Sequence, residues 1–186
     1  LKGVEEFAIE CSMIKVGTSE DIQNCADDGI QILGGMGFSA DTPMESAWRD
    51  ARIGRIYEGT NEINRMLSVG MLFKKSMRGD IDLMKAVMDV TSKISSKKSD
   101  ENIDPDQILS LEMQIVKNLK KIFLLISGYA IQKYGQELDK NQQVLIGLSN
   151  IMIEVYFSES AILRTLKNNK KGTDMKCQID MTSIYV

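Results

Sequence analysis

Two long stretches of helical periodicity, separated by a short turn, limit this chain of 186 residues to a mainly helical fold. The first runs from about residue 106 to Tyr134 and ends at Gly135, and the second runs from about residue 140 to 168. A short turn between two long amphipathic helices produces an antiparallel hairpin. The sequence shows no β-strand pattern of any length and no internal repeat or heptad array, so we predict an all-α fold. The apolar residues expected on the buried faces are Leu109, Val116, Leu119, Phe123, Ile126 and Ala130 in the first helix and Leu145, Leu148, Met152, Val155, Ala161 and Ile162 in the second.

Four capping patterns indicate where helices begin. The strongest is Thr42-Pro43-Met44-Glu45, with a capping Thr, Pro at the first helical position and Glu at the third. Each such cap satisfies backbone N–H groups that have no partner within the helix, and contributes about 1 kcal/mol. The other three patterns are Thr18 with Asp21, Asp104-Pro105 with Gln107, and Asp139 with Gln142.

A change of composition divides the chain. Residues 92–104 are rich in Ser and Lys and poor in apolar side chains, which is typical of a linker. We therefore predict a first helical domain over residues 1–78, a linker over 79–104 and a second helical domain over 105–186. The first is expected to be an up-down helical bundle, and the second to contain the long hairpin.

The composition excludes several kinds of active site. Because the chain has no His, it can form neither a Ser-His nor a Cys-His nucleophile pair, and no His-ligated zinc, haem or di-iron site. Any acid–base chemistry must use Asp, Glu, Lys, Tyr or Cys. The net charge of -3 argues against a protein that binds nucleic acid, because such domains are usually basic. Cys11, Cys25 and Cys177 fit neither a disulfide framework nor a zinc spacing, so we expect a reducing compartment and no metal site.

The two ends of the chain suggest a piece of a longer protein. An apolar helical pattern starts at Leu1, without Met, and the pattern before Val186 also stops midway. We see no signal peptide and no apolar run of the roughly 18 residues that a membrane span needs. We interpret the chain as a fragment of a soluble or peripheral protein, with a mature chain of trimmed ends as the alternative.

Three Gly residues lie close together in the stretch Gln-Ile-Leu-Gly-Gly-Met-Gly-Phe, residues 31–38. Glycine residues end a helix and leave backbone N–H groups accessible, so such a turn can approach a phosphate closely. A Gly C-cap followed by a tight turn gives the same pattern without any ligand.

A carboxylate stands in the stretch Tyr57-Glu58-Gly59-Thr60, just before a helix that Thr60 is expected to cap. On a turn, this side chain can reach into a cleft, and burial against apolar neighbours would make Glu58 a stronger general base. An acidic residue near a helix start is also favourable through the helix dipole alone.

Taken together, these two motifs and their neighbours closely resemble the acyl-CoA dehydrogenase family in its C-terminal helical domain. The resemblance covers roughly residues 1–78 and its motifs are specific. Residues 105–168 are similar, more loosely, to the additional C-terminal domain of the very-long-chain type, as in bacterial members. The stretches that carry the resemblance are Phe7-Ala8-Ile9-Glu10-Cys11-Ser12-Met13-Ile14-Lys15, residues 31–38, Arg49-Asp50-Ala51-Arg52 and residues 56–63.

The resemblance implies a flavin enzyme of fatty acid β-oxidation that converts long or very-long-chain acyl-CoA to trans-2-enoyl-CoA. In the family, the Glu of a Tyr-Glu-Gly-Thr motif removes the α-proton and FAD accepts the hydride; Glu58 matches that Glu. Tyr57 and Gly59 match substrate-binding positions. The residues that match FAD-binding stretches are Gln31, Ile32, Leu33, Gly34 and Gly35, toward the FAD of a neighbouring subunit, and Thr60, Asn61 and Glu62, the last of which is Gln in some relatives.

The resemblance also implies partners and a location. The expected partners are acyl-CoA, electron-transfer flavoprotein as electron acceptor and a second subunit in a homodimer. The expected compartment is the bacterial cytoplasm, with or without contact at the inner membrane face, or the mitochondrial matrix. Residues 66–77 mix apolar side chains with Lys74 and Lys75, and are interpreted as a helix on the core or as a membrane-surface contact. Because the N-terminal and middle domains of the family are missing, we expect the 186-residue chain alone to bind FAD poorly and to be inactive.

Two other functions stay open at this point. The chain could be a helical docking or oligomerisation module in which the enzyme motifs are vestigial. Alternatively, the same flavin site could act on another substrate, such as an acyl chain on a carrier protein.

Overall fold

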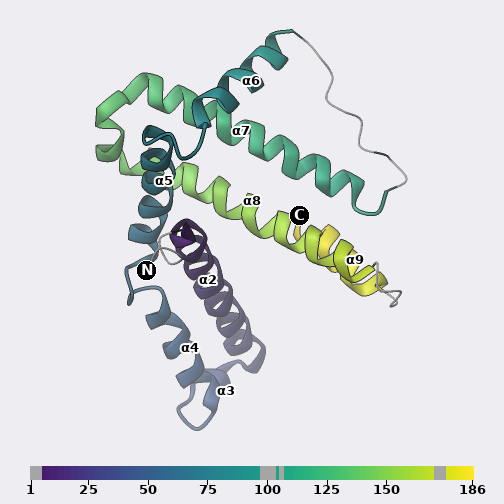
Figure 1. Ribbon diagram of the computed structural model, residues 1–186. Helices are drawn as coiled ribbons and strands as arrows, with labels where there is room; N and C mark the ends of the chain where they lie inside the picture. The colour runs from purple at the N-terminus through teal and green to yellow at the C-terminus, as the bar shows by residue number, and fades with distance from the viewer. Residues whose placement is uncertain (1–5, 97–103, 105–106, 170–174) are drawn as a thin grey trace. The chain divides into compact units, whose positions relative to one another are not determined.

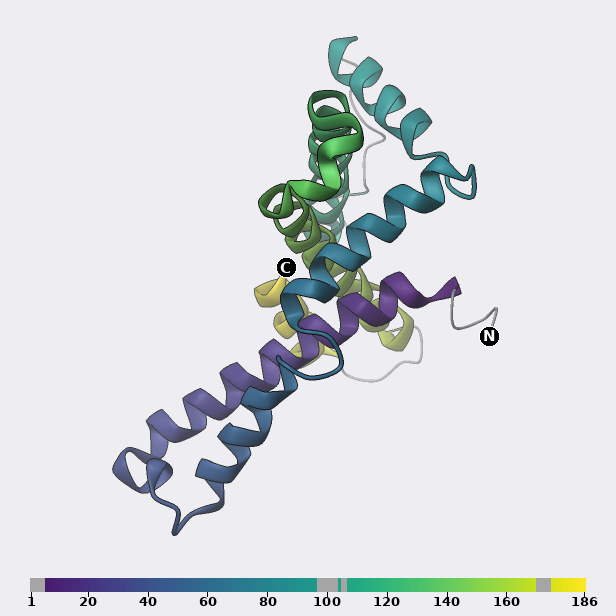
Figure 2. The ribbon, with the colours of Figure 1, turned by 90° about the vertical axis from the view of Figure 1, so that its left-hand side faces the viewer.

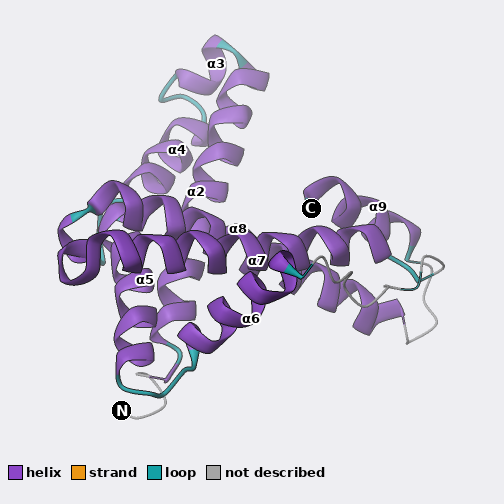
Figure 3. Ribbon diagram, turned by 90° about the horizontal axis from the view of Figure 1, so that it is seen from above, coloured by secondary structure: helices purple, strands orange, loops and turns teal. Residues whose placement is uncertain are grey.

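The computed structural model describes residues 6–96, 104, 107–169 and 175–186, and throughout these residues it contains helices and loops but no strand (Figure 3). This confirms the predicted all-α fold. The elements are α2 (Ala8–Leu33), α3 (Gly35–Phe38), α4 (Pro43–Gly54), α5 (Asn61–Met77), α6 (Leu83–Ser95), α7 (Ser110–Tyr134), the 3-10 helix η1 (Gly135–Lys140), α8 (Gln142–Asn169) and α9 (Lys176–Tyr185).

The chain forms two compact units, Leu1–Leu72 and Phe73–Val186. This differs from the sequence interpretation, in which residues 79–104 were a linker. Within that range, α6 is a regular helix whose Leu83 and Val87 are buried and which packs against α7. The Ser- and Lys-rich composition of its last turn hid this packing face, which lies in the first two turns of the helix. Within the predicted linker, residues 97–103 are outside the described part of the chain.

In the first unit, α2 and α4 run side by side and the short α3 joins them at one end (Figure 1). α4 begins at Pro43 with Thr42 as its N-cap residue, as predicted. The Thr42 hydroxyl does not cap the helix; it donates to the carbonyls of Met36 (2.8 Å) and Ser39 (3.2 Å) and so fixes the loop before α4. Within α4, the indole N–H of Trp48 donates to Asp27 Oδ1 of α2 at 3.1 Å, which links these two helices.

One predicted helix start is wrong. Thr18 lies inside α2, which is continuous from Ala8 to Leu33. Its hydroxyl donates to the carbonyl of Ile14 at 2.7 Å, a bond within the helix, instead of accepting from a backbone N–H at a helix start. A capping pattern inside a longer apolar periodicity therefore did not interrupt the helix.

The second unit contains the predicted antiparallel hairpin, formed by α7 and α8 (Figure 1). α7 ends at Tyr134, and Gly135 follows with a φ of 51°, as a C-capping glycine can. Two predicted starts are displaced. α7 begins at Ser110, four residues after the predicted start at 106, and Pro105 lies outside the described residues; Asp139 lies within η1, so that α8 begins after Asn141.

The buried face of the hairpin is largely the predicted one. Leu109, Val116 and Ile162 form a core cluster. Ile126, expected on the same face, is instead exposed. The C-terminal α9 joins this core, because the buried hydroxyls of Thr165 and Thr182 are hydrogen-bonded at 2.8 Å.

α8 is long and apolar enough to cross a membrane by length and composition, which differs from the sequence expectation that no stretch is. The core helix of a soluble protein meets the same criterion. Here α8 packs against α7, η1 and α9 and buries Leu145, Leu148, Ile153 and Ile162 in these contacts.

A polar network in the first unit joins the middle of α2 to the beginning of α5. Glu20 accepts two hydrogen bonds from the guanidinium of Arg65, at 2.8 and 2.7 Å, and a third from Asn61 Nδ2 at 3.1 Å. Arg55 adds an ion pair at 3.6 Å. Partial burial raises the pKa of Glu20, but the bonds from Arg65 and Asn61 and the charges of Arg65 and Arg55 outweigh it and hold that pKa below its ordinary value of 4.5. The network therefore requires an ionised Glu20.

Replacing Glu20 with Gln should destabilise the chain at neutral pH by about 1–3 kcal/mol, because hydrogen bonds to a charged group are lost. Since the folded-state pKa of Glu20 is depressed, its contribution is complete above about pH 4.5 and is lost as the pH falls through the folded-state pKa. Wild type and Glu20→Gln should therefore differ in melting temperature at pH 7, and the difference should shrink as the pH falls below 4.5. Glu45→Gln, which breaks an exposed i,i+4 pair with Arg49, is the matched control and should change little at either pH.

The contact between α6 and α7 can be tested at Gly128. A Cβ there would lie 2.5 Å from Cγ1 of Val87, a stiff and buried side chain. Gly128→Ala should therefore cost about 1–3 kcal/mol in urea unfolding, and Val87→Ala in the same chain should recover part of it. Gly147→Ala in α8, where a Cβ would meet nothing within 4 Å, should instead be neutral or stabilising by up to about 1 kcal/mol. Equal effects of the two Gly variants would contradict the packing of α6 on α7.

Candidate functional site

The turn that joins α4 to α5, residues 57–60, has an unusual backbone. Glu58 has a φ of 55° and Gly59 a φ of 82°, so two consecutive residues occupy the left-handed region. Gly59 adopts this conformation without penalty, but for Glu58 it costs on the order of 1 kcal/mol. Strained residues of this kind persist only where their surroundings hold them, and they concentrate at functional sites.

Asn64 holds the turn from within α5. Its Nδ2 donates to the carbonyls of Gly59 (2.8 Å), Thr60 (3.2 Å) and Glu58 (3.4 Å). A Cβ on Gly59 would lie 3.0 Å from this same Nδ2, which explains why the position needs Gly for space as well as for its φ. The carbonyl groups of the turn thus face the buried Asn64, while Glu58 itself is exposed.

A second contact reaches the turn from α2. Lys15 Nζ donates to the carbonyl of Gly59 at 2.8 Å and to Oδ1 of Asn61 at 2.7 Å. Sequence reasoning missed both Lys15 and Asn64. For Asn64, the one signal was an Asn inside a helix, where its propensity is poor. For Lys15 no local signal exists, because its acceptors lie 44 and 46 residues later.

The residues at the start of α5 have distinct roles. Thr60 caps the helix as predicted, since its hydroxyl accepts from the N–H of Ile63 at 3.3 Å. Asn61 is fully buried, and its side chain bonds Lys15, Ser19 and Glu20, so that the side chain does not face a ligand.

Glu62 is exposed and lies in the first turn of α5. A hydrogen bond from its own backbone N–H, and a second from the Thr60 hydroxyl, hold the pKa of Glu62 below its ordinary value. The carboxylate is thus ionised and favourably placed at a helix N-terminus, which is a sufficient structural reason for an acidic residue there.

The Gly-rich turn combines an accessible backbone with an apolar surface. Gly34 ends α2 with a φ of 60°, and a Cβ on Gly34 or Gly35 would meet nothing within 4 Å. Gly37 differs, because a Cβ there would lie 2.8 Å from the carbonyl oxygen of Ile30; it lets α3 fold back onto α2. Around the turn, Ile32 is 84% and Phe38 76% exposed, and the predicted residues Gln31 and Leu33 are exposed as well.

The structure does not bring the two predicted sets of site residues together. Lys15, which contacts the 57–60 turn, and Gln31 are 16 positions apart on α2. At 1.5 Å per residue, this places them about 24 Å apart along the helix axis. The 57–60 turn and the Gly-rich turn would therefore contact different ends of one long ligand, or two separate ligands.

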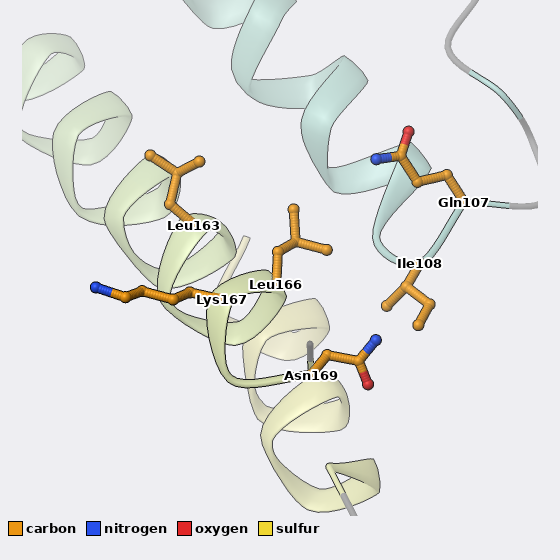
Figure 4. Close-up of a pocket in the computed structure, with 6 residues that line it drawn as sticks. All are labelled: Gln107, Ile108, Leu163, Leu166, Lys167 and Asn169. Atoms are coloured by element: carbon orange, nitrogen blue, oxygen red, sulfur yellow. The ribbon is translucent and has the colours of Figure 1, made fainter. Parts of the chain in front are cut away.

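A cavity in the second unit is separate from both sets. It has a volume of about 390 Å³ and lies between the turn before α7 and the last turns of α8 (Figure 4). None of its lining residues is a predicted site residue, and none carries a carboxylate: Gln107, Ile108, Leu163, Leu166, Lys167 and Asn169. Nor does the described part of the chain contain a group of three or more Cys, Asp or Glu residues arranged to hold a metal ion.

Comparison with known proteins gives the same family twice. Residues 2–71 and residues 118–186 each match a sequence family described as "Acyl-CoA dehydrogenase, C-terminal domain". A "Probable acyl-CoA dehydrogenase" of Bacillus subtilis is 41% identical over 166 residues, which is 89% of this chain and 28% of that protein. The rat mitochondrial "Short-chain specific acyl-CoA dehydrogenase" is 46% identical over 68 residues, 37% of this chain and 16% of that protein.

A solved structure agrees with these matches over nearly the whole chain. The crystal structure of an acyl-CoA dehydrogenase complexed with FAD from Bacillus anthracis superposes with a TM-score of 0.91 at 39% sequence identity, and covers 95% of this chain and 30% of that one. The chain thus spans less than a third of the length of these relatives. With both matched segments and this superposition assigned to one family, the chain belongs to the acyl-CoA dehydrogenases, whose C-terminal helical region it contains.

Proposed function

We propose that this chain supplies the catalytic base of an FAD-dependent acyl-CoA dehydrogenase, and that Glu58 is that base. The observation that supports this most directly is the 57–60 turn, in which Glu58 has a φ of 55° and is exposed while the turn carbonyls are held by Asn64 and Lys15. A carboxylate on a fixed turn can be aimed at one carbon atom of a substrate. The family membership supports the same residue through its Tyr-Glu-Gly-Thr motif.

The proposed reaction is removal of the α-proton of an acyl-CoA thioester by the Glu58 carboxylate. This proton is weakly acidic, so the base must be stronger than an exposed carboxylate. A substrate that covers Glu58 and expels water would provide that increase in basicity. When bound, FAD supplies the acceptor for the β-hydride, which is why neither His nor a metal is required.

Tyr57 and Gly59 are proposed to contact the substrate on either side of the base. The N–H groups of Glu58, Gly59 and Thr60 make no hydrogen bond within the described chain, in contrast to the carbonyls of the same turn. They are therefore available as donors to a carbonyl oxygen of a ligand. Since Gly59 has no side chain, a thioester can approach this backbone closely.

The residues proposed to bind FAD fit it to different degrees. Gly34 and Gly35 fit well, because their backbone is unobstructed to 4 Å where a side chain would stand; Gln31, Ile32 and Leu33 extend the same exposed surface. The N–H of Thr60 makes no hydrogen bond within the described chain and is a further candidate donor. The Asn61 side chain is buried and committed to the chain, and the ionised Glu62 would repel a flavin diphosphate. For Asn61 and Glu62, we therefore propose that only the backbone contacts FAD.

The finer features of the enzyme are also proposals. A preference for long or very long chains rests on the sequence resemblance of residues 105–168 to the very-long-chain type. A place in β-oxidation and transfer of electrons to an electron-transfer flavoprotein rest on the resemblance to the family. A homodimer follows from a Gly-rich turn that binds the FAD of a neighbouring subunit. For residues 66–77, the full burial of Ser68 and Val69 on α5 favours core packing over membrane contact. The compartment is proposed to be the bacterial cytoplasm or the mitochondrial matrix.

The proposed base can be tested in the full-length protein that carries this chain. Glu58→Gln removes the proton acceptor and preserves size, so reduction of bound FAD by a long-chain acyl-CoA should slow by about 10²–10⁴-fold in stopped-flow absorbance measurements. Asp89→Asn, a change at an exposed carboxylate on α6, is the control and should leave the rate unchanged. If Glu58→Gln reduces FAD at the wild-type rate, the alternative of a docking module with vestigial enzyme motifs is favoured, for which the exposed apolar surface around Phe38 would be the docking face.

The proposed FAD contact can be tested at Gly35 in the full-length protein that carries this chain. Gly35→Ala adds one methyl group where the chain itself has open space, so the melting temperature of the flavin-free protein should not fall. A methyl group between backbone and pyrophosphate should nevertheless weaken FAD binding, measured as the flavin-to-protein ratio after gel filtration. Gly147→Ala, equally unobstructed and in the second unit, should retain wild-type flavin. Equal flavin retention in both variants would exclude a close approach of FAD at Gly35.

A further inference from the structure

Lys15 is the residue of α2 that reaches the turn carrying the proposed base. It is half-buried, and its ammonium group donates to the Gly59 carbonyl at 2.8 Å and to Asn61 Oδ1 at 2.7 Å. Figure 2 shows α2 passing beside the loop that leads into α5. Gly59 belongs to this loop, and Asn61 is the first residue of α5. Neither the sequence motifs nor the family resemblance assigned a role to this side chain.

We propose that Lys15 is a positioning residue for Glu58. Its ammonium group fixes the carbonyl of Gly59, and thereby the peptide unit between Gly59 and Thr60, relative to the rigid helix α2; this restrains the turn one residue after Glu58. The Glu58 side chain then leaves the backbone in one direction. This inference rests on the proposed role of Glu58 as the base.

Lys15 does what Asn64 cannot do alone. Asn64 bonds the same turn, but it lies only four to six residues from its acceptors and moves with the start of α5. Lys15 comes from another helix, 44 residues earlier in the chain. Its hydrogen bonds are charge-assisted, and such bonds are roughly twice as strong as neutral ones. It thus bonds the turn itself to α2, in addition to the bonds that Asn61 and Arg65 of α5 make to the same helix.

The turn needs such a contact because its backbone is strained. Glu58 and Gly59 both have positive φ, and Glu58 would adopt a negative φ at lower energy if it were not held. A change of φ at Glu58 would move its carboxylate by more than the tolerance of a proton transfer, for which a misplacement of about 1 Å can cost about 10²-fold in rate.

Removing the ammonium group should not unfold the chain. The Gly59 carbonyl keeps its bond from Asn64 at 2.8 Å. Asn61 Oδ1 keeps the Ser19 hydroxyl at 3.2 Å, although the one proton of this hydroxyl is shared with the Val16 carbonyl at 3.0 Å. Each acceptor therefore keeps a donor within hydrogen-bond distance, which avoids the severe destabilisation that an unsatisfied buried group causes. Lys15→Met keeps the apolar stem and removes only the charge and the donors.

The test uses the full-length, FAD-loaded enzyme with Lys15→Met, Lys15→Arg and, as a matched control, Lys85→Met on an exposed position of α6. For Lys15→Met we expect kcat with a long-chain acyl-CoA to fall about 10–100-fold while KM changes less than about threefold, with FAD content and melting temperature unchanged. Lys15→Arg, which keeps a cationic donor, should recover part of the loss. The control should match the wild type.

A second measurement does not depend on activity. Cleavage after Glu58 by a glutamate-specific protease, followed by mass spectrometry, reports how often the turn leaves its held conformation. It should be several-fold faster in Lys15→Met than in Lys85→Met. Wild-type kcat and wild-type cleavage in Lys15→Met would overturn the inference, and so would a loss of kcat that follows loss of FAD or of melting temperature. If the wild type itself does not reduce FAD with acyl-CoA, the proposed function fails, and the cleavage rate alone still decides whether Lys15 holds the turn.

Discussion

The first unit depends on the hydrogen bonds that the buried side chain of Asn61 makes with α2. It is fully enclosed, yet it accepts from Lys15 and Ser19 through Oδ1 and donates to Ser19 and Glu20 through Nδ2. A buried amide without these partners would cost about 1–3 kcal/mol for each unsatisfied group. The partners all lie on one stretch of α2, so α5 can begin in only one position relative to that helix. Since the 57–60 turn ends where α5 begins, the same network determines where the turn closes.

In the 57–60 turn, the carbonyl groups and the N–H groups of the backbone have different roles. Its carbonyl groups accept hydrogen bonds from Asn64 and Lys15. Its N–H groups make no hydrogen bond within the described chain, and the Glu58 side chain is exposed. Glu58 is therefore held in a fixed, exposed position, without an apolar environment that would make its carboxylate a stronger base. Under the proposed function, that environment comes from the substrate and from parts of the enzyme that the relatives contain beyond the 28% matched here.

How far the sequence predicts this molecule depends on the range of the interactions. Pro43 and Gly135 act locally through a fixed φ and a positive φ, and both mark helix ends as predicted. Thr18 failed as a start because a hydroxyl within a helix can bond the carbonyl four residues earlier, so that the helix continues through it. α6 was missed because its packing partner, Gly128, lies about 40 residues later in the chain. In the candidate site, Glu58 and the glycines were visible as motifs, but Lys15 was not, since nothing near it in the sequence encodes a contact 44 residues away.

The position of the Gly-rich turn has a consequence for assembly. It lies about 24 Å along α2 from Lys15, which contacts the 57–60 turn; the helical rise alone sets this separation. The flavin ring of one FAD molecule cannot contact the 57–60 turn and the Gly-rich turn at the same time. The ring and the opposite end of FAD are far enough apart to contact different sites. The exposed Ile32 and Phe38 beside the accessible backbone of Gly34 and Gly35 are unfavourable in water and favourable against another protein surface. A second subunit whose FAD extends toward this turn would cover these side chains and use this backbone together, which is why the proposed homodimer accounts for the turn better than a monomer does.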